Sequence, residues 1–182
     1  MARLPYLDKD ALKDEDKELL ARNMNLHRIL AHSPGAARSF GALAKYIRFE
    51  STLDSRLREL TILQVGWLAK SPYEWVHHVE ISKNFGVTDD DIRALATETD
   101  GKDSGLPELD RLVLRVAREI TNNGAASLET FDALKMQMSS EHVVDLTVTI
   151  SFYNAVVRFL ASVGMDVEDS YQHYLETYPL PE

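Results

Sequence analysis

Two carboxylates and one histidine stand in adjacent segments of the sequence, where a single pocket could gather them. Glu59 lies midway along a stretch without helix breakers, and Glu74 and His78 follow in the next stretch. Groups of these two types can exchange protons near neutral pH when their surroundings separate their pKa values. We expect Glu59 to act as a general acid or base and His78 to act as its partner.

Glu59 is predicted to lie inside the protein. Asp54 can cap a helix that runs to Lys70, and the apolar side chains of this helix point to nearly all sides, as in a buried helix. Low-dielectric surroundings would raise the pKa of the Glu59 carboxyl group and keep a proton available near neutrality. The alternative is an ion pair with Arg56 or Arg58, because buried carboxylates are usually paired.

A second helix is predicted to begin at the run SPYE, from Ser71 to Glu74. This run has the pattern of a capping box, in which Glu74 reaches back to the Ser71 amide, and that role alone would account for Glu74. Ser71 and Glu74 could instead hold a substrate carboxylate or its water at the helix N-terminus. Helical spacing turns His78 inward and His77 toward an edge, although a single inward histidine can also be an ordinary core residue.

These segments resemble the carboxymuconolactone decarboxylase and alkylhydroperoxidase-D-like superfamily. The likeness is carried by the runs RELTIL (58–63), GWL (66–68) and YEWVHH (73–78), and it extends to NLHRILAHSP (25–34) and GVTDDDI (86–92). It covers most of the chain. The resemblance implies assembly of several copies into a homo-oligomer and, by its decarboxylase branch, chemistry on a small organic acid.

In the peroxidase branch of that superfamily, two cysteines follow the glutamate and precede the histidine. Ser71 and Glu74 occupy those positions here, and the chain contains no cysteine. Disulfide-linked peroxide reduction needs a thiolate and a resolving thiol, so this activity is excluded. The decarboxylase branch works without thiols, and the resemblance therefore implies acid–base chemistry by Glu59 and His78 without a cofactor.

Composition narrows the class of protein further. The 182 residues, 45% hydrophobic and 27% charged, suit one domain with a sizeable core and leave no evident linker. A formal charge of −9 argues against a nucleic-acid-binding surface, which needs clustered Lys and Arg. No signal-like apolar segment and no run of about 18 apolar residues is present, so we expect a cytoplasmic protein without a membrane partner.

The remaining signals predict an all-α bundle of about seven or eight helices. A polar arm (1–13) precedes a helix from Asp14 to about Leu30, and Ser33 with Pro34 opens another to about Phe49. Later helix starts and stops are signalled by four residues. These are Thr88, Gly124, Ser127 and Gly164.

The stretch from about Ser140 to Val163 is rich in Val, Thr and Ile, which favours strands, but it has no internal turn signal. We therefore predict a buried helix. Tyr153 on this helix is a candidate for the pocket wall and the substrate, or else an ordinary core tyrosine. Residues 165–182 form a tail with three tyrosines, expected to lie over the body or across another subunit.

No bound metal is expected. Glu74 and His78 stand four residues apart on one helix and could share an ion, but His77 points about 100° away and a catalytic zinc needs three protein ligands. We thus expect a decarboxylase, isomerase or related lyase acting on a small carbonyl- or lactone-bearing organic acid. The alternative is a non-catalytic binding or assembly protein, with Glu59 ion-paired, Glu74 a cap and His78 structural.

Overall fold

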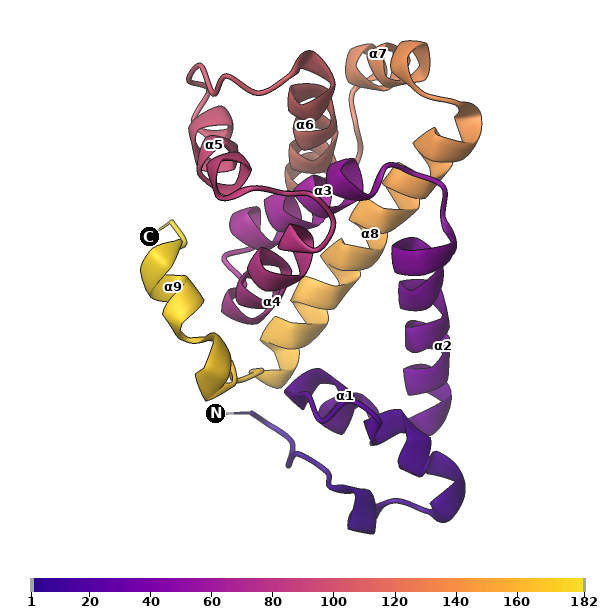
Figure 1. The fold of residues 1–182 in the computed structure, drawn as a ribbon. Helices are drawn as coiled ribbons and strands as arrows, with labels where there is room; N and C mark the ends of the chain where they lie inside the picture. The colour runs from indigo at the N-terminus through magenta and orange to yellow at the C-terminus, as the bar shows by residue number, and fades with distance from the viewer. Residues whose placement is uncertain (1, 182) are drawn as a thin grey trace.

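The computed structural model describes residues 2–181, and throughout this range the chain forms helices and loops without any strand (Figure 1). The predicted all-α class is thus confirmed. The α-helices are α1 (Asn25–Leu30), α2 (Pro34–Lys45), α3 (Ser55–Leu68), α4 (Pro72–Lys83), α5 (Asp89–Thr99), α6 (Glu108–Asn123), α7 (Leu128–Gln137), α8 (Ser140–Val163) and α9 (His173–Thr177). Short 3₁₀ helices occupy Lys9–Ala11, Asp14–Leu20 and Asp169–Tyr171, and a π-helical turn, Tyr46–Glu50, continues α2.

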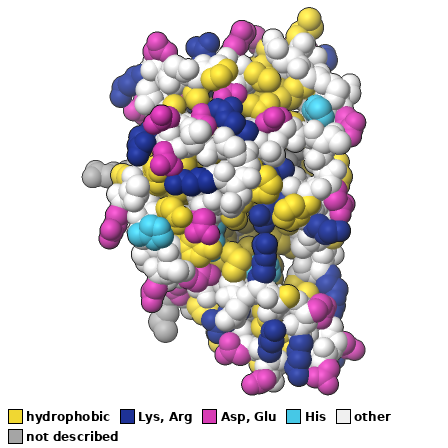
Figure 2. Space-filling view, in the orientation of Figure 1, with side chains coloured by type: hydrophobic (Ala, Val, Ile, Leu, Met, Phe, Trp, Pro, Cys, Tyr) yellow, Lys and Arg dark blue, Asp and Glu magenta, His cyan; other side chains and the backbone are white. Residues whose placement is uncertain are grey.

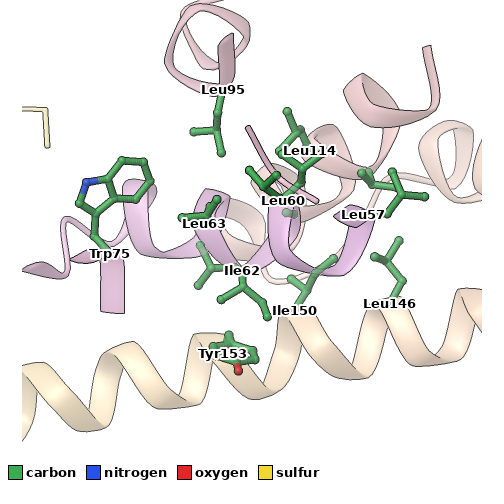
Figure 3. Close-up of a cluster of buried hydrophobic side chains, with 14 of the residues drawn as sticks. Leu57, Leu60, Ile62, Leu63, Trp75, Leu95, Leu114, Leu146, Ile150 and Tyr153 are labelled. Atoms are coloured by element: carbon green, nitrogen blue, oxygen red, sulfur yellow. The ribbon is translucent and has the colours of Figure 1, made fainter. Parts of the chain in front are cut away.

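Helix α3 is the centre of the fold. It packs against α4, α6 and α8, and every residue from Leu57 to Gly66 is buried. Leu60 and Leu63 face α5 and α6, whereas Ile62 faces α8 (Figure 3). The prediction of a helix that is apolar on nearly all sides and buried on all of them is confirmed.

The helix starts predicted at Asp54, Thr88 and Ser127 and the helix ends predicted at Gly124 and Gly164 are found in the structure. The Asp54 side chain accepts the Leu57 amide proton at 2.9 Å, and Thr88 forms a reciprocal capping box with Asp91. Ser127 accepts the Thr130 amide proton. Two helices end at glycines in the left-handed region. These are Gly124, with φ of 83°, and Gly164, with φ of 63°.

The single helix predicted from Asp14 to about Leu30 is wrong. A 3₁₀ helix ends at Leu20, Met24 is extended, and α1 begins anew at Asn25. The Asn25 amide donates to Glu168 Oε1 at 2.8 Å instead of to a carbonyl one turn earlier. A partner 143 residues away therefore decides where α1 begins.

Within residues 2–181, α8 is the one helix long and apolar enough to cross a membrane by length and composition. In this structure it runs along α3, and ten of its residues between Val143 and Leu160 are buried (Figure 1). Its buried Asp145 accepts hydrogen bonds from Tyr46 and Ser51, so the helix also joins the start of the chain to the core.

The C-terminal segment lies over the body of the same chain. Helix α9 packs beside α4, and the Trp75 indole N–H donates to the Tyr178 carbonyl oxygen at 2.7 Å (Figure 1). Tyr178 itself is buried. Homo-oligomeric assembly and a cytoplasmic location stay predictions.

Candidate active site

Four charged side chains from α3 and α4 form a row of alternating sign. Arg58 donates to Glu59 Oε1 through Nε at 3.2 Å and Nη2 at 3.0 Å. Glu59 Oε2 lies 2.7 Å from His78 Nδ1, and His78 Nε2 lies 3.1 Å from Glu74 Oε1. All four side chains are at least nine-tenths buried. The predicted meeting of Glu59, Glu74 and His78 is what the structure shows.

The pKa of Glu59 is lowered, which corrects the expectation of a raised value. Burial by itself raises the pKa of this carboxyl group, but the charges and hydrogen bonds of His78 and Arg58 outweigh it. Arg58 is therefore the ion-pair partner foreseen as the alternative. Arg56 pairs instead with Asp91 and Asp110. Glu59 is ionised at neutral pH and holds no proton to give.

His78 is held as an imidazolium. Burial lowers its pKa, yet the carboxylates of Glu59 and Glu74 on the two sides of the ring raise it from 6.5 to about 9. Both ring nitrogens then carry protons, so the ring has no lone pair at neutral pH. His78 can give a proton but cannot take one.

Glu74 is not a helix cap. The Ser71 side chain makes no capping bond, and the Ser71 amide, which a capping box would pair with Glu74, donates to the Gly66 carbonyl oxygen instead. Glu74 turns toward His78, one helical turn along α4. The 3.1 Å approach lacks hydrogen-bond geometry, and the buried Oε1 keeps an unfilled hydrogen-bonding position.

A cavity of about 530 Å³ opens beside this row. Glu74, His78 and Tyr153 line it, but Glu59 does not, since Glu59 lies behind the His78 ring with no exposed surface. The walls come from α1, α2, α4, α8 and the C-terminal segment. Basic side chains gather around the hollow on one face of the molecule (Figure 2).

Several polar atoms of the cavity wall are buried without a hydrogen-bond partner among residues 2–181. They are His27 Nδ1, Arg48 Nε, Glu74 Oε1 and His77 Nδ1. An unpaired buried polar group costs about 1–3 kcal/mol, so a wall that concentrates such atoms is suited to a polar ligand. Arg48 also forms no ion pair within the described range, and its guanidinium lies 5.0 Å from the Phe49 ring centre.

Tyr153 lies in the cavity wall, as predicted. Its ring meets the His78 ring edge-on, with 5.0 Å between ring centres. Burial, together with the negative charges of Glu74 and Glu59, raises the pKa of Tyr153 well above its ordinary value. The residue is thus a neutral phenol that can donate a hydrogen bond to a ligand oxygen.

Ser71 does not join the other predicted site residues. It lines a separate, smaller hollow of about 130 Å³ with Pro72, Val157 and Leu160. Ser71 lies in the tight junction between α3 and α4, where its amide donates to the Gly66 carbonyl oxygen. The substrate-binding role predicted for Ser71 therefore has no support from the position of this residue.

His77 was predicted to point toward an edge, but the structure places it in the cavity wall. Its ring is buried between Tyr73 and Tyr171, with centres 4.3 and 3.9 Å away, and Nε2 lies 2.9 Å from Glu168 Oε2. Helical periodicity missed this because the C-terminal segment covers a face of α4 that the periodicity assigns to solvent. Arg48 was missed because nothing in its neighbourhood in the sequence marks it.

Among residues 2–181, no group of three or more His, Asp and Glu side chains is arranged to hold a metal ion. The nitrogens of His78 both face carboxylates, and Glu168 faces His77. The prediction of no bound metal stays a prediction.

Residues 34–100, just over a third of the chain, match the Carboxymuconolactone decarboxylase family. None of the curated protein sequences compared with this chain matches it. The fold is similar to that of a peroxidase-related protein with an alkylhydroperoxidase AhpD core from Ralstonia eutropha JMP134. That likeness has a TM-score of 0.78 and 20% identity, over 93% of this chain and 94% of the other.

Two further solved structures are similar. The debrominase Bmp8, in complex with 2,3,4-tribromopyrrole, has a TM-score of 0.77 at 20% identity and covers 97% of this chain and 96% of its own. A peroxidase-related protein from Silicibacter sp. TM1040 has a TM-score of 0.68 at 17% identity, over 93% of each chain. At these identities the likeness shows the fold. The resemblance found in the sequence is confirmed by the family match over residues 34–100 and by the shared fold, and the sequence contains no cysteine.

Proposed function

We propose that the protein is a cofactor-free acid–base enzyme acting on a small organic acid that carries a carbonyl or lactone group. The observation that carries this proposal is the position of His78, a buried imidazolium between two carboxylates at the wall of a cavity. One of those carboxylates, Glu74, has an oxygen without a hydrogen-bond partner. Such a pair places a proton acceptor and a proton donor together at one point.

The geometry divides the roles differently from the first expectation. Glu74 and His78 line the cavity and are the catalytic pair. Glu59 does not touch the cavity, so it acts through His78 as a positioning residue. It fixes the ring orientation and, with its charge, keeps the imidazolium protonated. Arg58 in turn keeps Glu59 ionised.

The pair supports proton transfer next to a carbonyl group. Glu74 takes a proton from the carbon beside the carbonyl, and the electron pair of that C–H bond forms an enolate. The His78 imidazolium and the neutral Tyr153 phenol supply positive charge and a hydrogen-bond donor to the developing oxyanion. Isomerisation is completed when the same proton returns to another carbon. In decarboxylation, loss of CO₂ forms the enolate, and a proton from the pair is delivered to carbon.

Arg48 supports an acid as the substrate. It is a cation in the cavity wall without a carboxylate partner inside the described range, and its buried Nε is free to donate. Guanidinium groups bind carboxylates through paired hydrogen bonds. A small ring also suits the cavity, which has aromatic walls from Phe40, Phe152 and Tyr153, and Bmp8 holds a tribromopyrrole on the same fold.

Deuterium uptake tests the proposal without knowledge of the natural substrate. The protein is incubated in D₂O with a panel of 2-oxo acids and lactone acids, and deuterium incorporation is followed by mass spectrometry. Glu74→Gln and His78→Gln should each slow the uptake by ~10²–10⁴-fold. Glu129→Gln, a change at an exposed carboxylate, is the matched control and should leave it unchanged. Equal uptake with and without protein across the panel would contradict the proposal.

A non-catalytic binding protein is the second candidate, because Glu59 is fully buried and paired at both oxygens, as a structural residue would be. Stability separates the two roles for the cavity residues. If Glu74→Gln leaves the thermal midpoint unchanged or raises it, Glu74 is held for function rather than for folding. A fall of many degrees together with no deuterium uptake would favour the binding protein.

A further inference from the structure

His77 and Glu168 form a second histidine–glutamate pair at the same cavity. Nε2 of His77 lies 2.9 Å from Glu168 Oε2, and Nδ1 is buried without a partner in the described chain. The residue is 97% buried, since its exposed fraction is 3%, and it lines the cavity. The proposed acid–base reaction gives this pair no role.

The hydrogen bonds around Glu168 fix which nitrogen of His77 carries the proton. Glu168 also accepts the Asn25 amide proton at 2.8 Å and the Tyr73 hydroxyl proton at 3.2 Å. Burial raises the pKa of Glu168, but the hydrogen bonds from His77 and Asn25 lower it below the ordinary value. An ionised carboxylate only accepts, so Nε2 must donate. In the neutral ring the lone pair is then on Nδ1.

The ring cannot easily turn to hide that lone pair. Tyr73 and Tyr171 lie against His77 with ring centres 4.3 and 3.9 Å away. Turning the ring over would point a C–H group at Glu168 and lose the hydrogen bond. In the neutral ring, Nδ1 is therefore held as a hydrogen-bond acceptor in the wall, complementary to His78 next to it, which has two N–H groups and no lone pair.

We propose that His77 Nδ1 accepts a hydrogen bond from a hydroxyl group of the substrate, and that the cavity therefore takes a hydroxy acid whose carboxylate meets Arg48. The inference that the ligand is an acid rests on the proposed function. The inference that it carries a hydroxyl group rests on His77 and Glu168. His77 is the binding residue, and Glu168 with Tyr171 positions it.

Binding of matched probes tests the proposal by calorimetry. The probes are benzoate and the 2-, 3- and 4-hydroxybenzoates, which differ only in the hydroxyl group. At least one hydroxybenzoate should bind the wild-type protein about 10-fold more tightly than benzoate, the value of one hydrogen bond. His77→Phe, which keeps a ring between the tyrosines, should reduce this ratio to about 1. His32→Phe, at an exposed histidine outside the cavity, should preserve it.

Nitrogen-15 NMR of the wild-type histidines gives a readout that a purely structural His77 would not show. The free protein should carry the His77 proton on Nε2, and the Nδ1 resonance should move with the preferred hydroxybenzoate but not with benzoate. A proton on Nδ1 in the free protein, no binding of any probe, or an unchanged ratio in folded His77→Phe would each overturn the proposal. A protein that shows the hydroxyl preference but no deuterium uptake would retain this inference and lose the proposed function.

Discussion

His78 Nδ1 lies 2.7 Å from Glu59 Oε2 across the interface of α3 and α4. Neither group has more than a small exposed surface, so each depends on the other for its charged form. Removing one charge from such a pair leaves the other buried without compensation. The protonation state of His78 can therefore be changed by altering Glu59, which does not line the cavity.

Glu59→Gln should lower the pKa of His78. Burial already opposes the charged ring, and Glu59 is the strongest of the charges that favour it. The measurement is an NMR titration of the His78 ring. Glu168→Gln is the matched control, because it removes the carboxylate beside His77 and should leave the His78 titration in place. If the titration midpoint of His78 stays near 9 in Glu59→Gln, the charge of Glu59 does not keep the His78 ring protonated.

The free energy of unfolding should fall as the pH rises from 6.5 to about 9. The pKa of His78 is 6.5 in the unfolded chain and about 9 in the folded one, so the stabilisation is complete below 6.5 and is lost as the pH passes 9. This difference between the two pKa values of His78 corresponds to roughly 3 kcal/mol of the free energy of unfolding at most. Urea unfolding at a series of pH values measures it. His78→Gln should flatten the curve over this range, and an equally steep curve in that variant would assign the effect to another group.

Arg58→Ala should destabilise the fold by about 3–5 kcal/mol, because it removes one of two partners of a fully buried carboxylate. It also takes away the guanidinium that lies 4.5 Å from the Phe85 ring centre. Chemical denaturation gives the free energy. Arg115→Ala, at a half-exposed arginine, should stay within about 0.5 kcal/mol of wild type. Similar losses in the two variants would mean that the Arg58 pair contributes little.

Trp75→Phe should loosen the C-terminal segment while keeping the core. The substitution removes the indole N–H that donates to the Tyr178 carbonyl oxygen at 2.7 Å, at a cost of about 1 kcal/mol for the hydrogen bond alone. Amide hydrogen exchange should quicken in 169–180 and stay slow in α3. Exchange that quickens equally in both regions would indicate a general loss of stability instead.

Local signals in the sequence were enough to predict most of the fold. Asp54, Thr88, Ser127 and Gly164 act on amides or carbonyls within one turn, so their roles can be deduced from neighbours alone. The burial of α3 followed from its apolar pattern. The break before Asn25 could not be predicted in this way, because the partner of its amide is Glu168.

The candidate site could be predicted where helical periodicity and the family resemblance agreed. The prediction failed where contacts between distant segments of the chain determine which side chains line the cavity. Glu59, Glu74 and His78 meet as expected. Glu74 has the pattern of a cap, but the Ser71 amide is bonded to the Gly66 carbonyl oxygen, and Glu74 turns toward His78 instead. His77 and Arg48 could not be identified, because the chain segments that make them part of the cavity are far away in the sequence.

The separation of 91 residues between His77 and Glu168 has a consequence for synthesis of the protein. When α4 leaves the ribosome, the carboxylate that orients His77 has not yet been translated, and neither has the Tyr171 ring that covers it. The helical core around α3 can assemble from earlier segments, up to α8. The cavity wall is thus completed only when the last segment of the chain packs on α4.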